Sequence, residues 1–404
     1  MSKTLPLSRL ISGTSLQLSG SKSETNRLLL LQALYPSLSI ENASDSDDSK
    51  AMIQALLKGN GTIDIHHAGT AMRFLTAYFA SKENSKIVLT GSQRMKERPI
   101  GILVDALRQL GADISYTENE GCPPLSIKGK TLTGNAASLP ANVSSQYISA
   151  LMLIAPTLPN GLTLQLLGEL TSVPYIEMTA QLLRSVGIQV SFENQMSRIE
   201  PKSSVGNQSI TVESDWSSVS YWYSFVSLSE IGTTMRLSSF KKSSLQGDSV
   251  LQEIYQSLGV ETRFDGDTLI LTKISEAAPH LDCDLRNAPD IAQTIAVSCF
   301  GLGTSCHLTG LHTLKIKETD RLEALKNELS KFGADICVSD KDLSISRNGK
   351  MLSGVSVATY NDHRMAMAFA PLMLKTSFSV LNPEVVTKSY PHFWKDAEKA
   401  TRIL

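Results

Sequence analysis

The stretch ILVDALRQLGADISYT (residues 102–117) changes from helical to extended character at a single glycine. Its first half has apolar residues at the spacing of an amphipathic helix and ends in Leu110. Gly111 follows, and glycine suits the left-handed residue that closes many helices. The second half is rich in residues that favour strands. The stretch therefore predicts a helix, a glycine turn and a strand.

The same pattern recurs along the chain. Three further clear copies and one weaker copy are MTAQLLRSVGIQVSFE (178–193), VLQEIYQSLGVETRF (250–264), RLEALKNELSKFGADICV (321–338) and AMIQALLKGNGTIDI (51–65). Gly111, Gly187, Gly259 and Gly333 are spaced 76, 72 and 74 residues apart. One copy cannot bury its apolar face alone, so the repetition predicts stacked copies of one unit in two similar halves. The alternative is that helix, glycine and strand follow one another in any α/β protein.

Strand signals alternate with these helices, as in KIVLTGS (86–92), LTLQLLG (162–168), TMRLSSF (234–240) and TLILTKI (268–274). The chain has 404 residues, more than one core usually serves, so two domains are expected. A boundary is expected within VGNQSITVESDWSSVS (205–220), where a polar loop precedes a strand and a new helix.

Bulk composition excludes some classes of function. Lys and Arg number 38 against 39 Asp and Glu, so the chain has no general attraction for nucleic acid or anionic membranes. No stretch is apolar enough for a signal peptide or a membrane span. The five cysteines form no CxxC pair, which favours a reducing, cytoplasmic setting over a disulfide framework or a zinc site.

Polar and mostly basic residues stand at the predicted starts of several buried helices. These residues are Lys22 and Arg27, Arg73, Arg98, Ser144 with Ser145 and Gln146, Lys317 with Glu318 and Arg321, and Asp362 with His363 and Arg364. Taken singly, each has a plain explanation as a helix cap or a solvated first turn. A cation at a helix N-terminus opposes the macrodipole, however, so the repetition predicts a shared anion. Converging starts would form a strongly positive cleft for phosphates and carboxylates. Pro99 is expected to open the helix that follows Arg98.

Other chemistries have little support. The chain contains no GxxxxGK[ST], no GxGxxG after a strand and no HExxH. The pair His66 and His67 is too small a cluster to suggest a metal. Among the basic residues stand three acids, Asp215, Asp290 and Glu318, which could serve in proton transfer.

Taken together, these motifs resemble those of the enolpyruvyl transferases, and in particular the branch of that family that acts on shikimate 3-phosphate. Besides Lys22-Ser23 and Arg27, the matching motifs are AGTAMR (68–73), RMKERPIG (94–101), VSSQYISALML (143–153), SVPYIEMT (172–179), QGD (246–248), APDIAQTIAV (288–297), IKETDRLEAL (316–325), TYNDHRMAMAFA (359–370) and TKSYP (387–391). They run in family order over nearly the whole chain.

The resemblance implies an α/β (α+β) fold of two similar domains, each with three βαβαββ repeats in an inside-out α/β barrel. It places the second domain at about 21–212 and builds the first, discontinuous domain from 1–20 plus 213–404. It also puts the active site in the cleft between the two domains. The implied protein is a cytoplasmic monomer with no membrane or nucleic-acid partner.

The implied reaction transfers the enolpyruvyl group of phosphoenolpyruvate to the 5-hydroxyl of shikimate 3-phosphate and releases phosphate, without metal or cofactor. The resemblance gives catalytic roles to Asp290 as base and Glu318 as acid, with Lys22 a competitor for proton transfer. It implies contacts to shikimate 3-phosphate from Lys22, Ser23, Arg27, Ser144, Ser145, Gln146, Ser172, Tyr175, Asp290, Thr313 and Lys317. It implies contacts to phosphoenolpyruvate from Lys22, Gly69, Arg98, Gln146, Arg321, His363, Arg364 and Lys388.

Two positions depart from the family pattern, because His67 and Thr313 stand where asparagine is usual. Two alternatives stay open. A sister enzyme transfers enolpyruvyl to UDP-N-acetylglucosamine, but it typically has Lys-Asn instead of Lys22-Ser23 and a cysteine in the loop before Arg98. A non-catalytic binder of phosphorylated metabolites would need the cations but not both Asp290 and Glu318.

Overall fold

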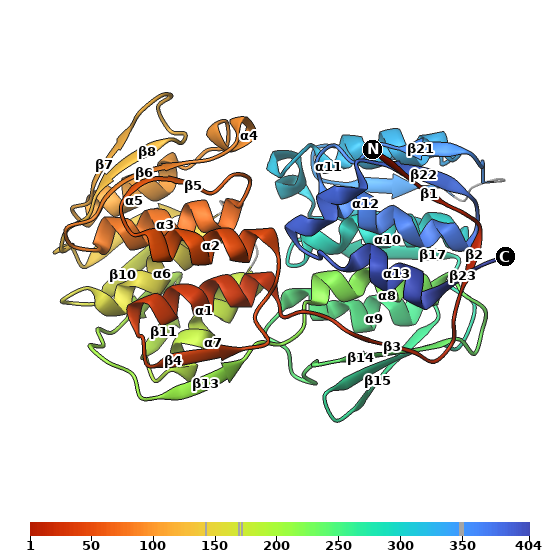
Figure 1. The fold of residues 1–404 in the computed structure, drawn as a ribbon, viewed down its shortest axis with the longest axis horizontal. Coiled ribbons are helices and arrows are strands. Elements are labelled where there is room, and N and C mark those ends of the chain that lie inside the picture. The colour runs from red at the N-terminus through yellow and green to blue at the C-terminus, as the bar shows by residue number, and fades with distance from the viewer. Residues whose placement is uncertain (142–143, 169, 171–172, 347–350) are drawn as a thin grey trace. The chain divides into compact units, whose positions relative to one another are not determined.

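The structure is a computed structural model that describes residues 1–141, 144–168, 170, 173–346 and 351–404 (Figure 1). Contacts divide the chain into two compact units. Unit 1 comprises Met1–Ser19 and Glu213–Leu404, and unit 2 comprises Gly20–Val212. The polar segment expected to hold a boundary therefore contains one of the two crossings between units, between Val212 and Glu213.

Unit 2 shows the repeat in its simplest form. Its elements, with 3-10 helices marked η, are α1 Lys22–Leu34, β4 Leu38–Glu41, α2 Asp47–Lys58, β5 Gly61–Asp64, α3 Gly69–Ser81, β6 Lys86–Thr90, α4 Gln93–Lys96, α5 Gly101–Gln109, β7 Asp113–Tyr116, β8 Leu125–Lys128, β9 Ala136–Pro140, α6 Ser145–Ile154, η1 Ala155–Thr157, β10 Leu162–Leu167, α7 Val173–Ser185, β11 Val190–Glu193, β12 Met196–Ile199 and β13 Gln208–Thr211. The segment β5-α3-β6-α5-β7-β8 forms one βαβαββ repeat with sheet order β5-β6-β8-β7. The segment β9-α6-β10-α7-β11-β12 forms a second with order β9-β10-β12-β11. A smaller sheet pairs β4 with β13 in parallel.

Unit 1 contains the same arrangement, but it takes strands from both ends of the chain. Its elements are β1 Ser2–Leu5, β2 Ser8–Leu10, β3 Thr14–Gln17, α8 Trp216–Ser227, β14 Thr234–Ser238, η2 Gly247–Val250, α9 Leu251–Ser257, β15 Val260–Asp265, β16 Thr268–Lys273, β17 His280–Asp284, η3 Pro289–Ile291, α10 Ala292–Leu302, β18 Ser305–Thr309, η4 His312–Ile316, α11 Arg321–Lys331, β19 Ile336–Val338, β20 Leu343–Ile345, β21 Val355–Val357, α12 His363–Phe369, η5 Ala370–Leu374, β22 Phe378–Leu381, η6 Pro383–Lys388, α13 Phe393–Ala400 and β23 Thr401–Ile403. The sheets have the orders β17-β18-β20-β19, β3-β14-β16-β15 and β1-β22-β21, and β2 pairs with β23. The N-terminal segment thus supplies β1, β2 and β3 to three different sheets.

The glycine turns predicted from the sequence are confirmed. Gly111, Gly187, Gly259 and Gly333 have φ values of 99°, 78°, 82° and 94°, each in the region that favours glycine. Each lies between an amphipathic helix (α5, α7, α9 or α11) and the strand that follows. The chain turns there from the core-facing helix into the outer sheet.

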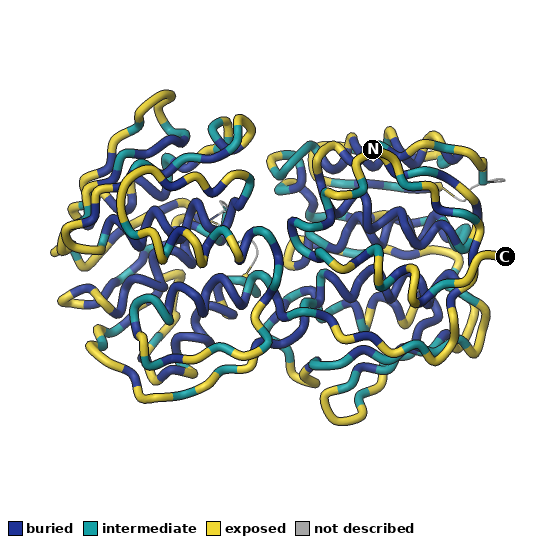
Figure 2. Tube along the Cα trace, viewed as in Figure 1, coloured by how far each residue is buried: buried dark blue, intermediate teal, exposed yellow. Residues whose placement is uncertain are grey.

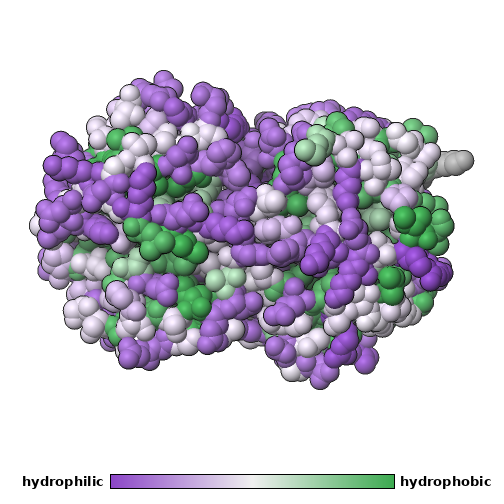
Figure 3. All heavy atoms as spheres, in the orientation of Figure 1, coloured by the Kyte–Doolittle hydropathy of each residue, from purple (hydrophilic) through white to green (hydrophobic). Residues whose placement is uncertain are grey.

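In each unit, apolar helices lie inside and sheets lie outside (Figure 2). Helices α3, α6, α8, α10 and α12 are buried along almost their whole length, because they are apolar or small-residue all round. Strands such as β10 and β16 alternate between buried and partly exposed residues, so each sheet has one face toward the helices and one toward solvent. The face in Figure 3 is accordingly mostly hydrophilic, with hydrophobic residues in small groups.

One sequence prediction about a helix start is wrong. Helix α5 begins at Gly101 and not at Pro99. The amide groups of Ile100 and Gly101 both donate to the carbonyl of Gly121, which turns the chain before the helix begins. The Pro99 carbonyl accepts hydrogen bonds from Arg73 and Tyr147, so this residue serves as an anchor before the helix.

Candidate active site

The predicted site residues form one cluster in each unit, and each cluster is described by itself. In unit 2, α1 begins at Lys22 after the N-cap Ser21, whose hydroxyl accepts from the amide of Glu24. The Lys22 ammonium lies 3.7 Å from the buried carboxylate of Asp48 in the first turn of α2. Asp48 is not among the predicted site residues, although its place among acids at a helix start was a signal. Asp48 holds the Lys22 side chain in one direction.

Arg27 is buried, and its guanidinium joins three helices of unit 2. It donates to Thr179 Oγ1 in α7 (2.7 Å), to Ser149 Oγ in α6 (3.0 Å) and to the Ser23 carbonyl in α1 (2.8 Å). Burial lowers its pKa to about 10, and the Tyr175 side chain nearby opposes that shift. The helix starts that carry Lys22, Ser144 and Tyr175 are therefore cross-linked by one cation.

The first turn of α3 allows a side chain to approach its backbone closely. A Cβ added to Gly69 would lie 2.6 Å from Nη1 of Arg98, so only glycine lets this guanidinium lie against the helix start. Arg73 donates to the carbonyls of Gly69 and Pro99 and so fixes the loop that carries Arg98. A cation, free helix amides and a small residue together suit an anionic group.

Helix α6 brings further polar groups to the same part of unit 2. Ser144 caps α6 and accepts from the Gln146 amide, and Gln146 Nε2 donates to Thr70 Oγ1 at 3.3 Å. Ser145 is the first residue of the helix and is buried. Tyr175 lies in the first turn of α7, with its ring 6.0 Å from the Arg27 guanidinium. Ser172 lies outside the described residues.

In unit 1, the guanidinium of Arg321 lies among three carboxylates. It donates to Asp362 Oδ2 (2.7 Å), Asp290 Oδ1 (2.8 Å) and Glu318 Oε2 (2.8 Å). Burial lowers the pKa of Arg321, but Asp362, Glu318 and Asp290 outweigh burial and raise that pKa above its ordinary value. Arg321 thus fixes the two acids predicted for proton transfer at one place.

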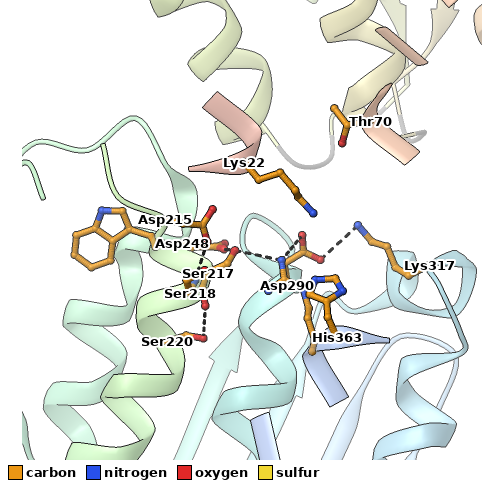
Figure 4. A network of polar contacts seen from close by, with 12 residues as sticks. Lys22, Thr70, Asp215, Ser217, Ser218, Ser220, Asp248, Asp290, Lys317 and His363 are labelled. Atoms are coloured by element: carbon orange, nitrogen blue, oxygen red, sulfur yellow. Dashed lines mark hydrogen bonds and ion pairs between the residues drawn. The ribbon is translucent and has the colours of Figure 1, made fainter. Parts of the chain in front are cut away.

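Asp290 also faces other cations (Figure 4). Its carboxylate lies 3.3 Å from Arg364 Nη2 and 3.5 Å from Lys317 Nζ. Burial by itself raises the pKa of Asp290, but Arg364, Lys317 and Arg321 together hold it well below its ordinary value. Burial lowers the pKa of Lys317, against the opposing effect of Asp290.

Glu318 also has cationic partners. Besides Arg321, it accepts from Lys388 Nζ at 2.6 Å, and both cations are almost completely buried. His363 is the first residue of α12 and is buried, next to the N-cap Asp362. The Thr313 hydroxyl oxygen is buried and has no hydrogen-bond partner among the described residues.

In unit 1, carboxylates are interleaved with the predicted cations. Lys317, Arg321, Arg364 and Lys388 are each paired with Asp290 or Glu318. Buried cations without partners would be costly, so the carboxylates compensate them when no ligand is bound. The cluster can exchange these internal anions for the anionic groups of a ligand.

No site role was predicted for Ser217, Asp248 or Asp362. Asp362 is the N-cap of α12 and binds Arg321, and the motif that contains it was the available signal. Asp248 belongs to the motif QGD, and its carboxylate accepts from the hydroxyl of Ser217. No sequence pattern marked Ser217, because serine at the start of a helix is ordinary.

Two features are absent from the part of the chain that the structure describes. It holds no group of three or more His, Cys, Asp or Glu side chains arranged to bind a metal ion. None of its helices combines the length and apolar character that crossing a bilayer requires.

Two solved structures show the fold of this chain. An EPSP synthase from Acinetobacter baumannii matches with a TM-score of 0.79 at 21% identity, over 99% of this chain and 98% of that one. The enolpyruvyl transferase NikO from Streptomyces tendae matches with a TM-score of 0.68 at 14% identity, over 99% of each chain. The fold is therefore that of the enolpyruvyl transferases, as the sequence motifs predicted.

Sequence comparisons show which family of enolpyruvyl transferases the chain belongs to. The family model described as EPSP synthase (3-phosphoshikimate 1-carboxyvinyltransferase) matches residues 57–397. A 3-phosphoshikimate 1-carboxyvinyltransferase from Bacteroides fragilis is 46% identical over 96% of this chain and 95% of that protein. One from Haemophilus influenzae is 35% identical over 96% of each. The chain belongs to the EPSP synthase family.

Proposed function

We infer that this chain is a 3-phosphoshikimate 1-carboxyvinyltransferase. It transfers the enolpyruvyl group of phosphoenolpyruvate to the 5-hydroxyl of shikimate 3-phosphate and releases phosphate, a step of aromatic amino acid biosynthesis. The observation that carries this inference is the pair Asp290 and Glu318 on one buried guanidinium, Arg321. Binding of anions needs the cations alone, whereas two fixed carboxylates suit a reaction that removes one proton and adds another.

We propose that both units contribute to one active site, because the residues matched by the family motifs occur in each. The residues proposed for shikimate 3-phosphate are Lys22, Ser23, Arg27, Ser144, Ser145, Gln146, Ser172, Tyr175, Asp290, Thr313 and Lys317. Those proposed for phosphoenolpyruvate are Lys22, Gly69, Arg98, Gln146, Arg321, His363, Arg364 and Lys388. The close approach of Arg98 to Gly69 and the buried hydroxyl of Thr313 support these assignments.

Asp290 is the proposed base for the 5-hydroxyl. Without ligand, its three cationic neighbours make it a weak base, since they hold its pKa well below the ordinary value. When the anionic groups of the substrates bind Arg321, Arg364 and Lys317, these cations stabilise the Asp290 carboxylate less. Substrate binding therefore raises the basicity of Asp290 at the moment when a proton must be removed.

Glu318 is the proposed acid for the methylene carbon of phosphoenolpyruvate. Its ion pairs with Arg321 and Lys388 favour the ionised form, so it must first receive a proton. The Lys388 ammonium lies 2.6 Å from Glu318 Oε1. Lys22, held by Asp48, stays the competing donor.

The reaction then balances in two steps. In the first, C3 of phosphoenolpyruvate gains a proton, the 5-oxygen bonds to C2, and Asp290 takes the hydroxyl proton. In the second, Glu318 takes a proton back from the methyl group, the C2=C3 double bond forms again, the bond from C2 to the phosphate oxygen breaks, and phosphate leaves with the proton that Asp290 had taken. Fixed cations stabilise the charge that develops on the phosphate, and binding both substrates together lowers the entropic cost.

The deciding experiment is phosphate release from the purified protein with both substrates, in the presence of a chelator. Release should need both substrates and should fall by roughly a thousandfold in Asp290→Ala. The matched control is Asp284→Ala, an aspartate of unit 1 that pairs with Arg286 but is half exposed. Equal activity in both variants would show that Asp290 is not the base.

The same assay separates the alternatives. Release with UDP-N-acetylglucosamine and not with shikimate 3-phosphate would identify the sister reaction. Tight binding of both phosphorylated substrates without any phosphate release would identify a binding protein.

We also propose that the enzyme acts in the cytoplasm, in agreement with five cysteines that are all free thiols. We propose further that it is a monomer. Light scattering across a concentration series tests the monomer.

A further inference from the structure

Arg364 has two contacts through a single nitrogen atom. Its Nη2 lies 3.3 Å from the carboxylate of Asp290 and donates to the hydroxyl oxygen of Ser217 at 3.2 Å. If the proposed function is right, phosphoenolpyruvate competes with Asp290 for this guanidinium. The contact to Ser217 is neutral and does not need to break when an anion binds. Ser217 can therefore hold Arg364 in place while its anionic partner changes.

Ser217 is itself oriented by a carboxylate. Its hydroxyl donates to Asp248 Oδ2 (Figure 4). An ionised carboxylate only accepts hydrogen bonds, whereas a hydroxyl has one hydrogen and free lone pairs. The Ser217 hydrogen is therefore directed to Asp248, and its lone pairs are left for Arg364. A carboxylate behind the hydroxyl also makes the hydroxyl oxygen a stronger acceptor.

The position of Asp248 lowers the stability of the folded state. Its side chain is only 4% exposed, and its Oδ1 atom is buried without a hydrogen-bond partner among the described residues. Burial raises its pKa to about 6, with a further contribution from Asp290. A buried carboxylate with one oxygen unsatisfied destabilises a fold, so packing alone does not account for it.

The loop that carries Asp248 is tied to the start of α8. Gln246 accepts from the amide of Trp216 at 2.9 Å and donates to the carbonyl of Ser214 at 2.9 Å. The segment before α9 and the segment before α8 are thereby held together. This explains why the motif QGD contains both a glutamine and an aspartate: the first fixes the loop and the second orients Ser217.

We propose that Asp248, acting through the hydroxyl of Ser217, positions the guanidinium of Arg364 for phosphoenolpyruvate. Asp248 and Ser217 are then positioning residues for phosphoenolpyruvate, and neither touches the reacting atoms. The proposal rests on the proposed function in naming that substrate. Its geometric part, the chain from Asp248 to Ser217 to Arg364, stands on the contacts within unit 1 alone.

The test is steady-state kinetics of Ser217→Ala, Asp248→Ala and the double variant. Each single variant should raise the KM for phosphoenolpyruvate about tenfold, the size expected for loss of a hydrogen bond to a charged group. The kcat should change less than about threefold, and the KM for shikimate 3-phosphate should not change. Because Asp248 acts through Ser217, the double variant should be no worse than Ser217→Ala. Additive effects in the double variant would overturn the proposal.

Three further variants distinguish a positioning role from a general loss of structure. Ser217→Thr keeps the hydroxyl and should restore the KM of the parent protein. Asp248→Asn keeps the shape and should have a smaller effect than Asp248→Ala. Ser220→Ala removes another buried hydroxyl of α8 that bonds to the Ser217 carbonyl and Thr294 but does not contact Arg364. If Ser220→Ala raises the KM for phosphoenolpyruvate as much as Ser217→Ala does, the proposal is wrong.

A binding measurement separates this proposal from the proposed function. Calorimetry with inorganic phosphate needs no turnover, and Ser217→Ala should bind phosphate about tenfold more weakly than the parent protein. If the parent protein shows no turnover but this difference is found, the proposed function fails and the positioning role stands. If parent and variant bind phosphate equally, or neither binds it, the positioning role is overturned.

Discussion

Arg27 shows that a predicted ligand contact can also join helices within the protein. The sequence motif implied that it binds shikimate 3-phosphate, and that role stays a prediction. In the structure its guanidinium is already hydrogen-bonded to Thr179, Ser149 and the Ser23 carbonyl. The planar group with several N–H donors can join helices α1, α6 and α7, which an ammonium group cannot do.

We therefore expect Arg27→Lys to destabilise unit 2 even without substrate. Loss of two or more hydrogen bonds from a buried charged group should cost about 3 kcal/mol. Hydrogen exchange in the intact protein measures this, since amides of α1, α6 and α7 should exchange faster. The control is Arg94→Lys, where the arginine is about half exposed and pairs with Glu97. Equal protection in the two variants would mean that Arg27 is not a structural cross-link.

Thr313 carries a buried hydroxyl group for which substrate is a candidate hydrogen-bond partner. Its hydroxyl oxygen is buried without a hydrogen bond among the described residues. Thr313→Val has the same shape, so it should raise the KM for shikimate 3-phosphate roughly fivefold without loss of stability. Thr304→Val is the contrasting control, because the Thr304 hydroxyl donates to the Ala278 carbonyl and the variant should lose stability but not substrate affinity. The opposite pattern in the two variants would exclude Thr313 from the substrate site.

At the scale of elements, the starts of the buried helices combine residues that cap the helix with charged residues of the candidate site. Ser21, Ser144, Asp320 and Asp362 are N-caps that accept from backbone amides. The cations beside them are compensated by carboxylates from neighbouring elements, as Asp48 of α2 does for Lys22. A cation that opposes the helix macrodipole is tolerated because a carboxylate lies within ion-pair distance.

The contact between η2 and α8 predicts an unusual pH dependence of stability. The folded pKa of Asp248 is raised to about 6, above the ordinary value near 3.8, so this carboxyl stabilises the folded state below pH 4 and loses that contribution as pH rises through 6. Asp248→Asn cannot titrate. Relative to the parent protein it should gain about 3 kcal/mol between pH 4 and pH 8.

Urea unfolding followed by tryptophan fluorescence checks this prediction. All three tryptophans, Trp216, Trp222 and Trp394, lie in unit 1 together with Asp248. Subtracting the parent curve from the variant curve removes the contributions of other carboxylates, including Asp290, whose lowered pKa acts in the opposite direction. A constant difference between pH 4 and pH 8 would show that Asp248 has an ordinary pKa.

At the scale of the whole molecule, the two units differ in how the chain builds them. Unit 2 is one continuous segment, Gly20–Val212. Unit 1 needs Met1–Ser19, because β1 pairs with β22, β3 pairs with β14 and β2 pairs with β23. β1 and β2 can pair only after β22 and β23, near the end of the chain, have been made, so two sheets of unit 1 close late.

This difference predicts the behaviour of fragments. Residues 20–212 expressed alone should unfold cooperatively, whereas residues 213–404 alone should not, because three of its sheets each lack a strand. Joining residues 1–19 behind residue 404 should restore a cooperative transition in tryptophan fluorescence. The linker must reach from Leu404, whose amide donates to the Leu7 carbonyl, back along the chain to Met1, so about ten flexible residues are needed. A cooperative transition in 213–404 alone would contradict this account.

The sequence by itself determined the repeated helix–glycine–strand unit, the buried helices and the main cations and carboxylates of the candidate site. These features are local: a left-handed glycine, an apolar helix and a capping residue depend on neighbours a few residues away. The predicted strands in KIVLTGS and TLILTKI are confirmed as β6 and β16 for the same reason.

Tertiary structure alone decided which charges neutralise each other. Arg321 meets Asp290 and Asp362 at sequence separations of 31 and 41 residues, and Ser217 meets Arg364 at a separation of 147. No local pattern encodes such pairs, because they arise only when helix starts from different repeats converge. The cations of unit 1 therefore lie in a compensated cluster, since buried cations are stable only with anionic partners nearby.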